Sequence, residues 1–166
     1  ICGNSASNSF EKNLNSLSIR INVDADRNVY ARFGTYYIYQ QGINMYVYYN
    51  ANPSGKATGD CVIRAISTVT GLPWRTVHWD LATLSNEMYQ MMDDNVVWHE
   101  YLRRLGYDIH TVQIPCTRVK DFGKCFPIGK YILGTGKHVI AVMDGDYFDP
   151  WDSGNELAVF YWKLEE

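Results

Sequence analysis

Hydrophobic and polar positions alternate in the N-terminal part of the chain. Apolar side chains occupy every second position of Leu17–Val23, which is the period of a strand with one buried face. A polar turn follows, and 29–33 and 36–39 are expected to pair with this strand as a β-meander. Residues 1–16 are rich in Asn and Ser, and we expect them to form a loosely ordered lead-in.

The spacing changes from strand-like to helical after the turn-rich segment 50–56. Three segments carry apolar side chains on one helical face, and each is bounded by residue types that begin or end helices. Asp60 is expected to be the N-cap of the first helix. The predicted helices lie between Asp60 and Gly71, between Pro73 and Asn86, and between Asp94 and Gly106.

Short strands dominate the remaining sequence. The dipeptide Asp144-Gly145 separates two apolar runs and is a strong signal for a tight hairpin. The pattern predicts strands at 107–114, 131–133, 138–143, 147–148 and 157–162 and a short helix at 118–125. Helices followed by a run of strands predict an α+β fold.

Composition and charge narrow the function classes. A chain of 166 residues with 46% hydrophobic side chains forms one domain with a real core. The net charge of −3 lacks the basic excess of nucleic-acid binders, and no long apolar run predicts membrane insertion. Residues 1–45 hold four basic and three acidic side chains, and 46–166 hold eleven and fifteen. We therefore divide the chain into a β-rich extension, 1–45, and a main domain, 46–166.

The four cysteines are far apart and form no CxxC pair, so neither a zinc site nor a dense disulfide scaffold is expected. We expect Cys116 and Cys125 to be unpaired packing or surface residues and Cys2 to be incidental. Reduced thiols favour a cytoplasmic location. Residue 1 is Ile rather than Met, which suggests a processed chain and leaves a secreted form open.

Cys61 is the strongest candidate for chemistry because it lies in the first turn of a predicted helix. The positive end of the helix dipole favours thiolate over thiol and lowers a cysteine pKa from about 8.5. Backbone N–H groups of the same turn lack intrahelical partners and are placed to receive an oxyanion. Cys61 is therefore the expected nucleophile of an acyl-transfer reaction.

His138 is the best candidate base, because it opens an apolar strand directly after a flexible glycine-containing segment. The other arm of the predicted hairpin returns Asp149 to its side, since strands joined by a tight turn place such positions next to each other. A carboxylate bonded to one imidazole nitrogen fixes the tautomer and supports the imidazolium. The expected catalytic set is Cys61, His138 and Asp149.

Three segments together resemble a known family. They are TGDCVIRAI at 58–66, GKHVIAV at 136–142 and YFDPWDSG at 147–154. In this order they are similar to the papain-like cysteine peptidase superfamily, in particular its compact bacterial and phage-borne branch similar to C39 peptidases. The resemblance covers about 46–166. It implies a helical half carrying the cysteine, packed on an antiparallel sheet carrying the histidine, with the cleft between them. It does not account for 1–45.

One position departs from the family. Papain-like enzymes usually carry a Gln six residues before the cysteine to complete the oxyanion hole, and Gly55 stands there. This departure argues against efficient proteolysis, although the amide of Asn52 is a candidate substitute. Asp152 is a rival orienter of His138 or, more simply, holds its own turn. Trp151 either walls the cleft or caps the core.

We therefore expect a thiol-dependent hydrolase, a peptidase or amidase, that acts on a protein or peptide and needs no cofactor or metal. His78, His99 and His110 fall at no metal-ligand spacing. The alternative is a catalytically weak or inactive binding or inhibitory protein of the same fold, encoded by a phage. A third hypothesis keeps the chemistry but changes the acceptor, as in cell-wall amidases or transglutaminase-like enzymes. The sequence fixes neither the substrate nor the oligomeric state.

Overall fold

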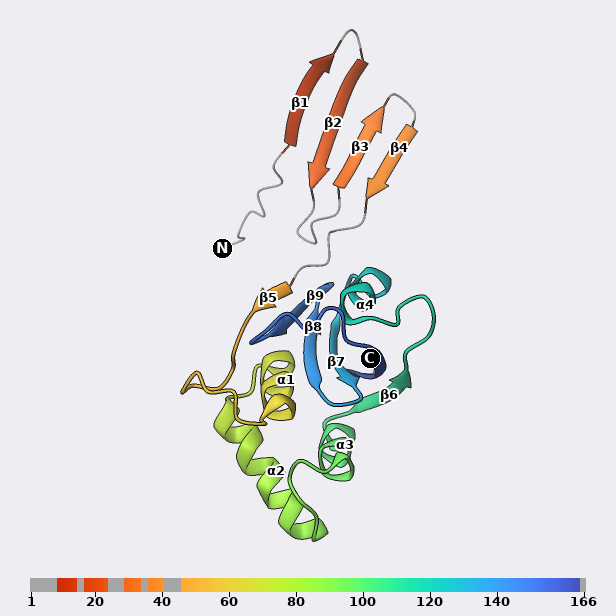
Figure 1. Ribbon diagram of the computed structural model, residues 1–166. Coiled ribbons are helices and arrows are strands. Elements are labelled where there is room, and N and C mark those ends of the chain that lie inside the picture. Colours follow the sequence, from red (N-terminus) through yellow and green to blue (C-terminus); the bar gives the residue numbers. More distant parts are fainter. Residues whose placement is uncertain (1–8, 15–16, 24–28, 34–35, 41–45, 165–166) are drawn as a thin grey trace. The chain divides into compact units, whose positions relative to one another are not determined.

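The computed structural model in Figure 1 describes residues 9–14, 17–23, 29–33, 36–40 and 46–164. The chain divides into two compact units, Ile1–Ile43 and Asn44–Glu166. Cys2 and Met45 lie outside the described residues.

The N-terminal unit holds a four-stranded antiparallel sheet in sequential order: β1 (Ser9–Leu14), β2 (Leu17–Val23), β3 (Val29–Phe33) and β4 (Tyr36–Gln40). The expected β-meander is confirmed for β2 to β4. The expectation of a loose lead-in was wrong for β1. This strand lies at the sheet edge, where backbone hydrogen bonds to the strongly alternating β2 suffice, so its own sequence needs no apolar alternation.

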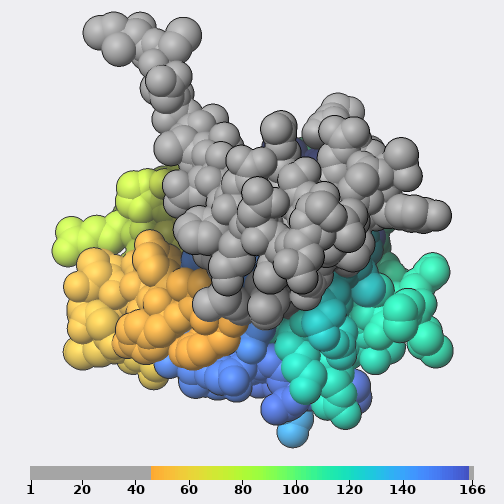
Figure 2. All heavy atoms as spheres, turned by 90° about the horizontal axis from the view of Figure 1, so that it is seen from above, coloured from red at the N-terminus to blue at the C-terminus, as the bar shows by residue number. Residues whose placement is uncertain are grey.

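The second unit is an α+β fold around a mixed six-stranded sheet in the order β5-β9-β8-β7-β10-β6. Its strands are β5 (Tyr46–Tyr48), β6 (Tyr107–Thr111), β7 (Lys130–Thr135), β8 (Val139–Met143), β9 (Asp146–Asp149) and β10 (Ala158–Leu164). The expectation of a purely antiparallel sheet was wrong, because β5 runs parallel to β9. Figure 2 shows this segment (orange) beside the C-terminal strands (blue).

Helices cover both faces of this sheet. They are α1 (Cys61–Thr70), α2 (Trp74–Met88), α3 (Asn95–Arg104) and α4 (Val119–Cys125). In Figure 1, α1 lies against β8, and α4 lies near β9. Ile132 and Ala141 share a core with α1 to α3, whereas Leu133 and Ile140 share a second core with α4. Because β8 is buried on both faces, its sequence is apolar without alternation.

The element boundaries depend on local caps and turns. α1 ends at Thr70, and Gly71 follows in the left-handed region with φ 75°, as its sequence predicts. Asp94 caps α3 by accepting a hydrogen bond from the Val96 N–H. Asp144 and Gly145 both have positive φ and form the expected hairpin turn between β8 and β9. α2 extends to Met88, beyond the expected end at Asn86.

Cys116 and Cys125 form a disulfide with a Cα–Cα distance of 6.1 Å, so the expectation that both are unpaired was wrong. Folding of α4 brings Cys125 at its end back to Cys116 before its start, a proximity that sequence separation alone does not reveal. Because two of the cysteines are paired, reduced thiols no longer support a cytoplasmic location. Within the described residues, no helix is both long and apolar enough to cross a membrane.

Candidate active site

Cys61 is the first residue of α1, and its position is fixed by the packing of that helix. Ile63 and Ile66 bury their side chains in the core shared with β7 and β8. This packing directs the N-terminus of α1 toward the start of β8. Cys61 is partly buried and is the free thiol among the cysteines of the described residues. The N–H groups of the first turn have no partner within the helix.

His138 and Asp149 lie side by side across the β8–β9 hairpin. The imidazole Nε2 and the Asp149 Oδ2 are 2.7 Å apart, and both side chains are buried. Thr135 holds the main chain of His138 in place, because its Oγ1 accepts a hydrogen bond from the His138 N–H at 3.1 Å. The Thr135 hydroxyl in turn donates to Glu156 at 2.9 Å. The histidine therefore has a fixed main chain and a ring oriented by a carboxylate.

The Cys61 thiol lies close enough to the His138 imidazole for each group to shift the pKa of the other. Because Nε2 faces Asp149, Nδ1 is the ring nitrogen left for the thiol. The backbone N–H of Val139 also favours the thiolate. The fold therefore brings together three side chains that are distant in the sequence, with the thiol beside an imidazole that is hydrogen-bonded to a buried carboxylate.

Both reacting groups have displaced pKa values. Burial alone raises the pKa of the Cys61 thiol, but the hydrogen bond and charge of His138, the Val139 N–H and the charge of Arg64 outweigh it and lower the pKa below its ordinary value. Burial lowers the pKa of His138, but the hydrogen bonds and charges of Asp149 and Cys61 raise it to about 9. Both shifts favour the thiolate–imidazolium pair over the thiol and the neutral imidazole.

Trp151 covers the imidazole. Its ring stacks on His138 with centroids 4.5 Å apart and planes 25° apart, and it remains 43% exposed. The Arg64 guanidinium lies over the Trp151 ring, 5.8 Å from its centroid. The contact with His138 supports the expectation that Trp151 forms a wall of the site rather than a cap on the core.

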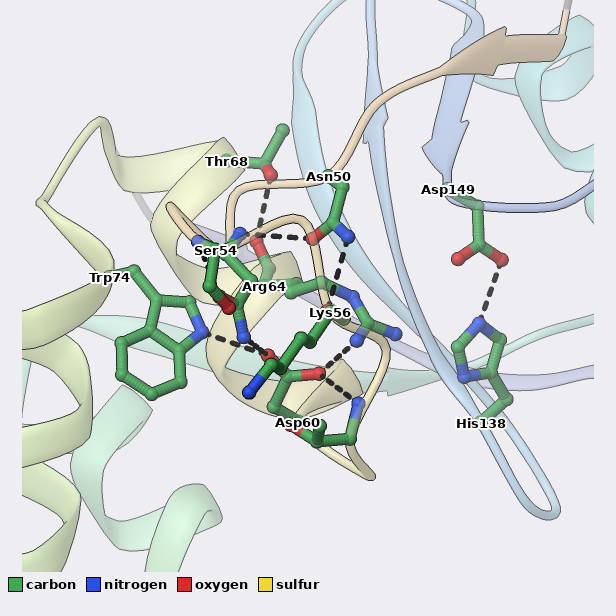
Figure 3. Close-up of polar contacts among 11 residues, drawn as sticks. Asn50, Ser54, Lys56, Asp60, Arg64, Thr68, Trp74, His138 and Asp149 are labelled. Atoms are coloured by element: carbon green, nitrogen blue, oxygen red, sulfur yellow. Dashed lines mark hydrogen bonds and ion pairs between the residues drawn. The ribbon is translucent and has the colours of Figure 1, made fainter.

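Asp60 is buried in a polar network of its own (Figure 3). Its carboxylate accepts from Asn52 Nδ2 at 2.8 Å and Trp74 Nε1 at 3.0 Å, and it pairs with Arg64. Asp60 stands at the N-cap position of α1 but makes no side-chain cap bond, so the expectation of a capping side chain was wrong. These partners compete successfully with the free N–H groups of the helix because one of them carries a full charge.

The two supporting candidates both have other partners. Asn52 is buried, and its amide donates to Asp60, so its role as an oxyanion donor stays a prediction for the second N–H of the amide. Asp152 Oδ1 accepts from the Tyr147 hydroxyl at 2.6 Å and from the Gly154 N–H at 3.0 Å. It therefore holds its own turn, and Asp149 is the carboxylate that bonds His138.

A cavity of about 470 Å³ adjoins both Cys61 and His138. Its lining includes the buried Trp98, the partly buried Phe160 and the exposed Asp93 and Lys137. The site therefore adjoins a space lined by both aromatic and charged side chains.

The structure adds residues that the sequence analysis did not single out. Arg64 and Thr135 contact the site, and the Val139 N–H favours the thiolate. The signal for Arg64 is a charged residue one turn after Cys61 in a helix whose other residues are all uncharged, which is unusual on a buried face. Among the described residues, no three His, Cys, Asp or Glu side chains gather in a way that could hold a metal.

No family model, curated protein or solved structure matches the chain. What the site does must therefore follow from its own geometry.

Proposed function

We propose that the protein is a thiol-dependent hydrolase that cleaves amide bonds, with Cys61 as nucleophile, His138 as acid and base, and Asp149 as the orienting carboxylate. The observation that carries this proposal is a thiol that lines one cavity with an imidazole whose other side is hydrogen-bonded to a buried carboxylate. A cysteine that merely packed in the core would not need a bonded base with a raised pKa.

The reaction begins with the Cys61 thiolate, whose proton resides on His138 Nδ1. The sulfur attacks the amide carbonyl carbon and forms an S–C bond, and the carbonyl oxygen takes the negative charge beside the Cys61 N–H. The C–N bond then breaks as the imidazolium gives its proton to the departing amine. Water attacks the thioester with His138 as base, which releases a carboxylic acid and restores the thiol.

The cavity beside the pair is the proposed binding site for the substrate residue next to the cleaved bond. Its volume of about 470 Å³ lies in the range of ligand pockets. Trp98 and Phe160 favour a large apolar or aromatic side chain, and burial of such a group stabilises the complex. Lys137 and Asp93 in the lining are placed to contact the polar main chain of a peptide.

The order of the three residues and their mounting on a helix and a sheet support the resemblance to the papain-like superfamily. A cysteine at a helix N-terminus packed on a sheet that carries its histidine is the arrangement that the resemblance implies. Membership in that superfamily remains part of this proposal.

Cleavage of a peptide library tests the proposed function directly. Wild-type protein and the Cys61→Ala variant are incubated with a mixture of peptides at pH 7, and cleavage products are identified by mass spectrometry. We expect cleavage by the wild type only, next to large apolar residues. If both proteins leave every peptide intact while iodoacetamide also fails to modify Cys61 faster at pH 6 than a free cysteine derivative, the proposal is wrong.

The second candidate is a binding protein without turnover, and one observation favours it. Gly55 stands where the related enzymes place the oxyanion amide, and the Asn52 amide is bonded to Asp60. This candidate predicts that the wild type and Cys61→Ala capture the same peptides with equal affinity, and that neither releases products. Cys61 would still react rapidly with iodoacetamide, because alkylation needs the thiolate but no oxyanion hole.

A further inference from the structure

A buried ion pair stands directly beside the proposed nucleophile. Asp60 precedes Cys61 in the chain, Arg64 follows it by one helical turn, and the two side chains are only 5% and 6% exposed. Removing two charges from water is costly, and well-packed apolar residues often give equal stability. A role beyond stability is therefore a reasonable expectation for this pair.

Arg64 also contacts the group that covers the base. Its guanidinium carbon lies 5.8 Å from the centre of the Trp151 ring, within the range of cation–π interactions. The same indole stacks on His138 at 4.5 Å. In Figure 3 the Arg64 side chain extends from α1 toward the side on which His138 and Asp149 lie.

Trp151 lies in the turn between β9 and β10, and it is 43% exposed. Its ring stacks on His138 and lies below the Arg64 guanidinium. Asp152 ties the neighbouring residue of the turn to Tyr147, but this bond does not fix the indole plane.

We propose that Arg64 is a positioning residue that, held by Asp60, keeps the Trp151 ring stacked on His138. This inference rests on the proposed function. Through this contact α1, which carries Cys61, also holds the Trp151 ring that covers His138. The stacked indole shields the His138–Asp149 hydrogen bond from water, and this bond is stronger in a drier environment.

Arginine suits this position better than lysine. Its planar guanidinium bonds a carboxylate along one edge while its face packs on an aromatic ring, whereas an ammonium offers a single point charge. The Arg64 charge also contributes to the lowered pKa of Cys61. A Lys at this position would keep the charge and the partner Asp60 but lose the contact of the guanidinium with the Trp151 ring.

The test compares Arg64→Lys, Trp151→Leu and the double variant, with Trp151→Phe as the control that retains an aromatic ring. The rate of Cys61 alkylation by iodoacetamide is measured from pH 4 to 10, a readout that requires no known substrate. Each single variant is expected to alkylate about threefold more slowly at pH 6, because the thiolate midpoint rises by about half a pH unit. Trp151→Phe is expected to retain most of the wild-type rate.

The double variant decides whether Arg64 acts through Trp151. We expect Arg64→Lys to have no further effect on the pH profile when Trp151 is already Leu. Losses that multiply, or a wild-type profile in Trp151→Leu, would overturn the inference. Trp151→Leu alone keeps the test decisive if Arg64→Lys does not fold, since the indole is largely outside the core.

The outcomes also separate this inference from the proposed function. If wild-type Cys61 titrates like an ordinary thiol, the proposed function fails together with the inference. If the wild type has the low midpoint and the Trp151 and Arg64 variants share it, only the positioning role is lost.

Discussion

Two buried carboxylates flank Cys61, and they differ in the partner that neutralises them. Asp60 pairs with Arg64, whose charge is permanent, and also accepts from Asn52 and Trp74. Asp149 is bonded to the side chain of His138, whose charge changes with pH. Both aspartates are at least nine-tenths buried. Burial alone therefore does not distinguish a structural carboxylate from a reactive one.

The difference lies in what each partner can do after its bond has formed. An Arg remains protonated, so the Asp60 pair can hold side chains in place but cannot transfer a proton. An imidazole can release and recover a proton while the carboxylate keeps it oriented. Variants at the two aspartates should therefore separate loss of stability from loss of activity.

The largest effect is expected from removing the partner of Asp149. His138→Ala takes away the base and the positive charge beside the thiolate, so amide hydrolysis should fall by roughly 10²–10⁴-fold. Selective alkylation of Cys61 at pH 6 should disappear as well. Cleavage assays and alkylation rates measure this, with His78→Ala as a matched control. Activity within a factor of two of the wild type would contradict the claim that Asp149, unlike Asp60, belongs to the reactive part of the site.

Removing Asp60 should instead destabilise the fold. Asp60→Ala leaves the Arg64 charge buried without its partner, and we expect the free energy of unfolding to fall by roughly 3–5 kcal/mol. Urea denaturation at pH 7 measures this change. Asp152→Ala is the control, because that carboxylate is exposed and pairs with neutral groups. Equal denaturation midpoints for wild type and Asp60→Ala would contradict the structural role.

The pH dependence of hydrolysis sharpens the comparison further. Activity requires the thiolate and the imidazolium together, so it should rise with the lowered pKa of Cys61 and decline above about pH 9, where His138 loses its proton. In Asp149→Asn the amide oxygen still orients the ring, but the negative charge is absent. Without that charge the pKa of His138 falls, so the alkaline limb of the pH profile should shift to lower pH by about one unit or more. An unchanged limb would mean that Asp149 contributes no charge to the site.

The smallest effect is expected from removing the hydrogen bond between Tyr147 and Asp152. Tyr147→Phe removes the hydroxyl that donates to Asp152, and this should cost about 1 kcal/mol of stability while leaving the pH profile of hydrolysis unchanged. Thermal unfolding and the same cleavage assay measure both quantities. A shifted profile would indicate that Asp152, too, acts on His138.

Much of the second unit follows from local sequence patterns. The spacing of apolar residues located α1 to α3, and Asp144-Gly145 located the β8–β9 hairpin that aligns His138 with Asp149. These features depend on neighbours in the chain, which is why periodicity and turn chemistry suffice. The same hairpin brings His138 and Asp149 together, whereas the approach of Cys61 to His138 depends on the packing of α1 against β8.

The features that the sequence analysis missed depend on distant partners. The role of Asp60 is decided by Trp74, which is 14 residues away, and by Asn52 on the preceding loop. The parallel pairing of β5 with β9 joins segments about 100 residues apart without a turn to specify it. The disulfide depends on the folded length of α4. None of these leaves a periodic signal in the chain.

The Cys116–Cys125 bridge has a practical consequence for handling the purified protein. The proposed catalysis requires Cys61 to remain reduced, whereas this fold contains an oxidised pair, with Cys125 on the surface. A strong dithiol added to protect the nucleophile would also open the bridge, and a buffer without reductant would leave Cys61 open to oxidation. The choice and concentration of reductant are therefore experimental variables to be titrated before any two preparations are compared.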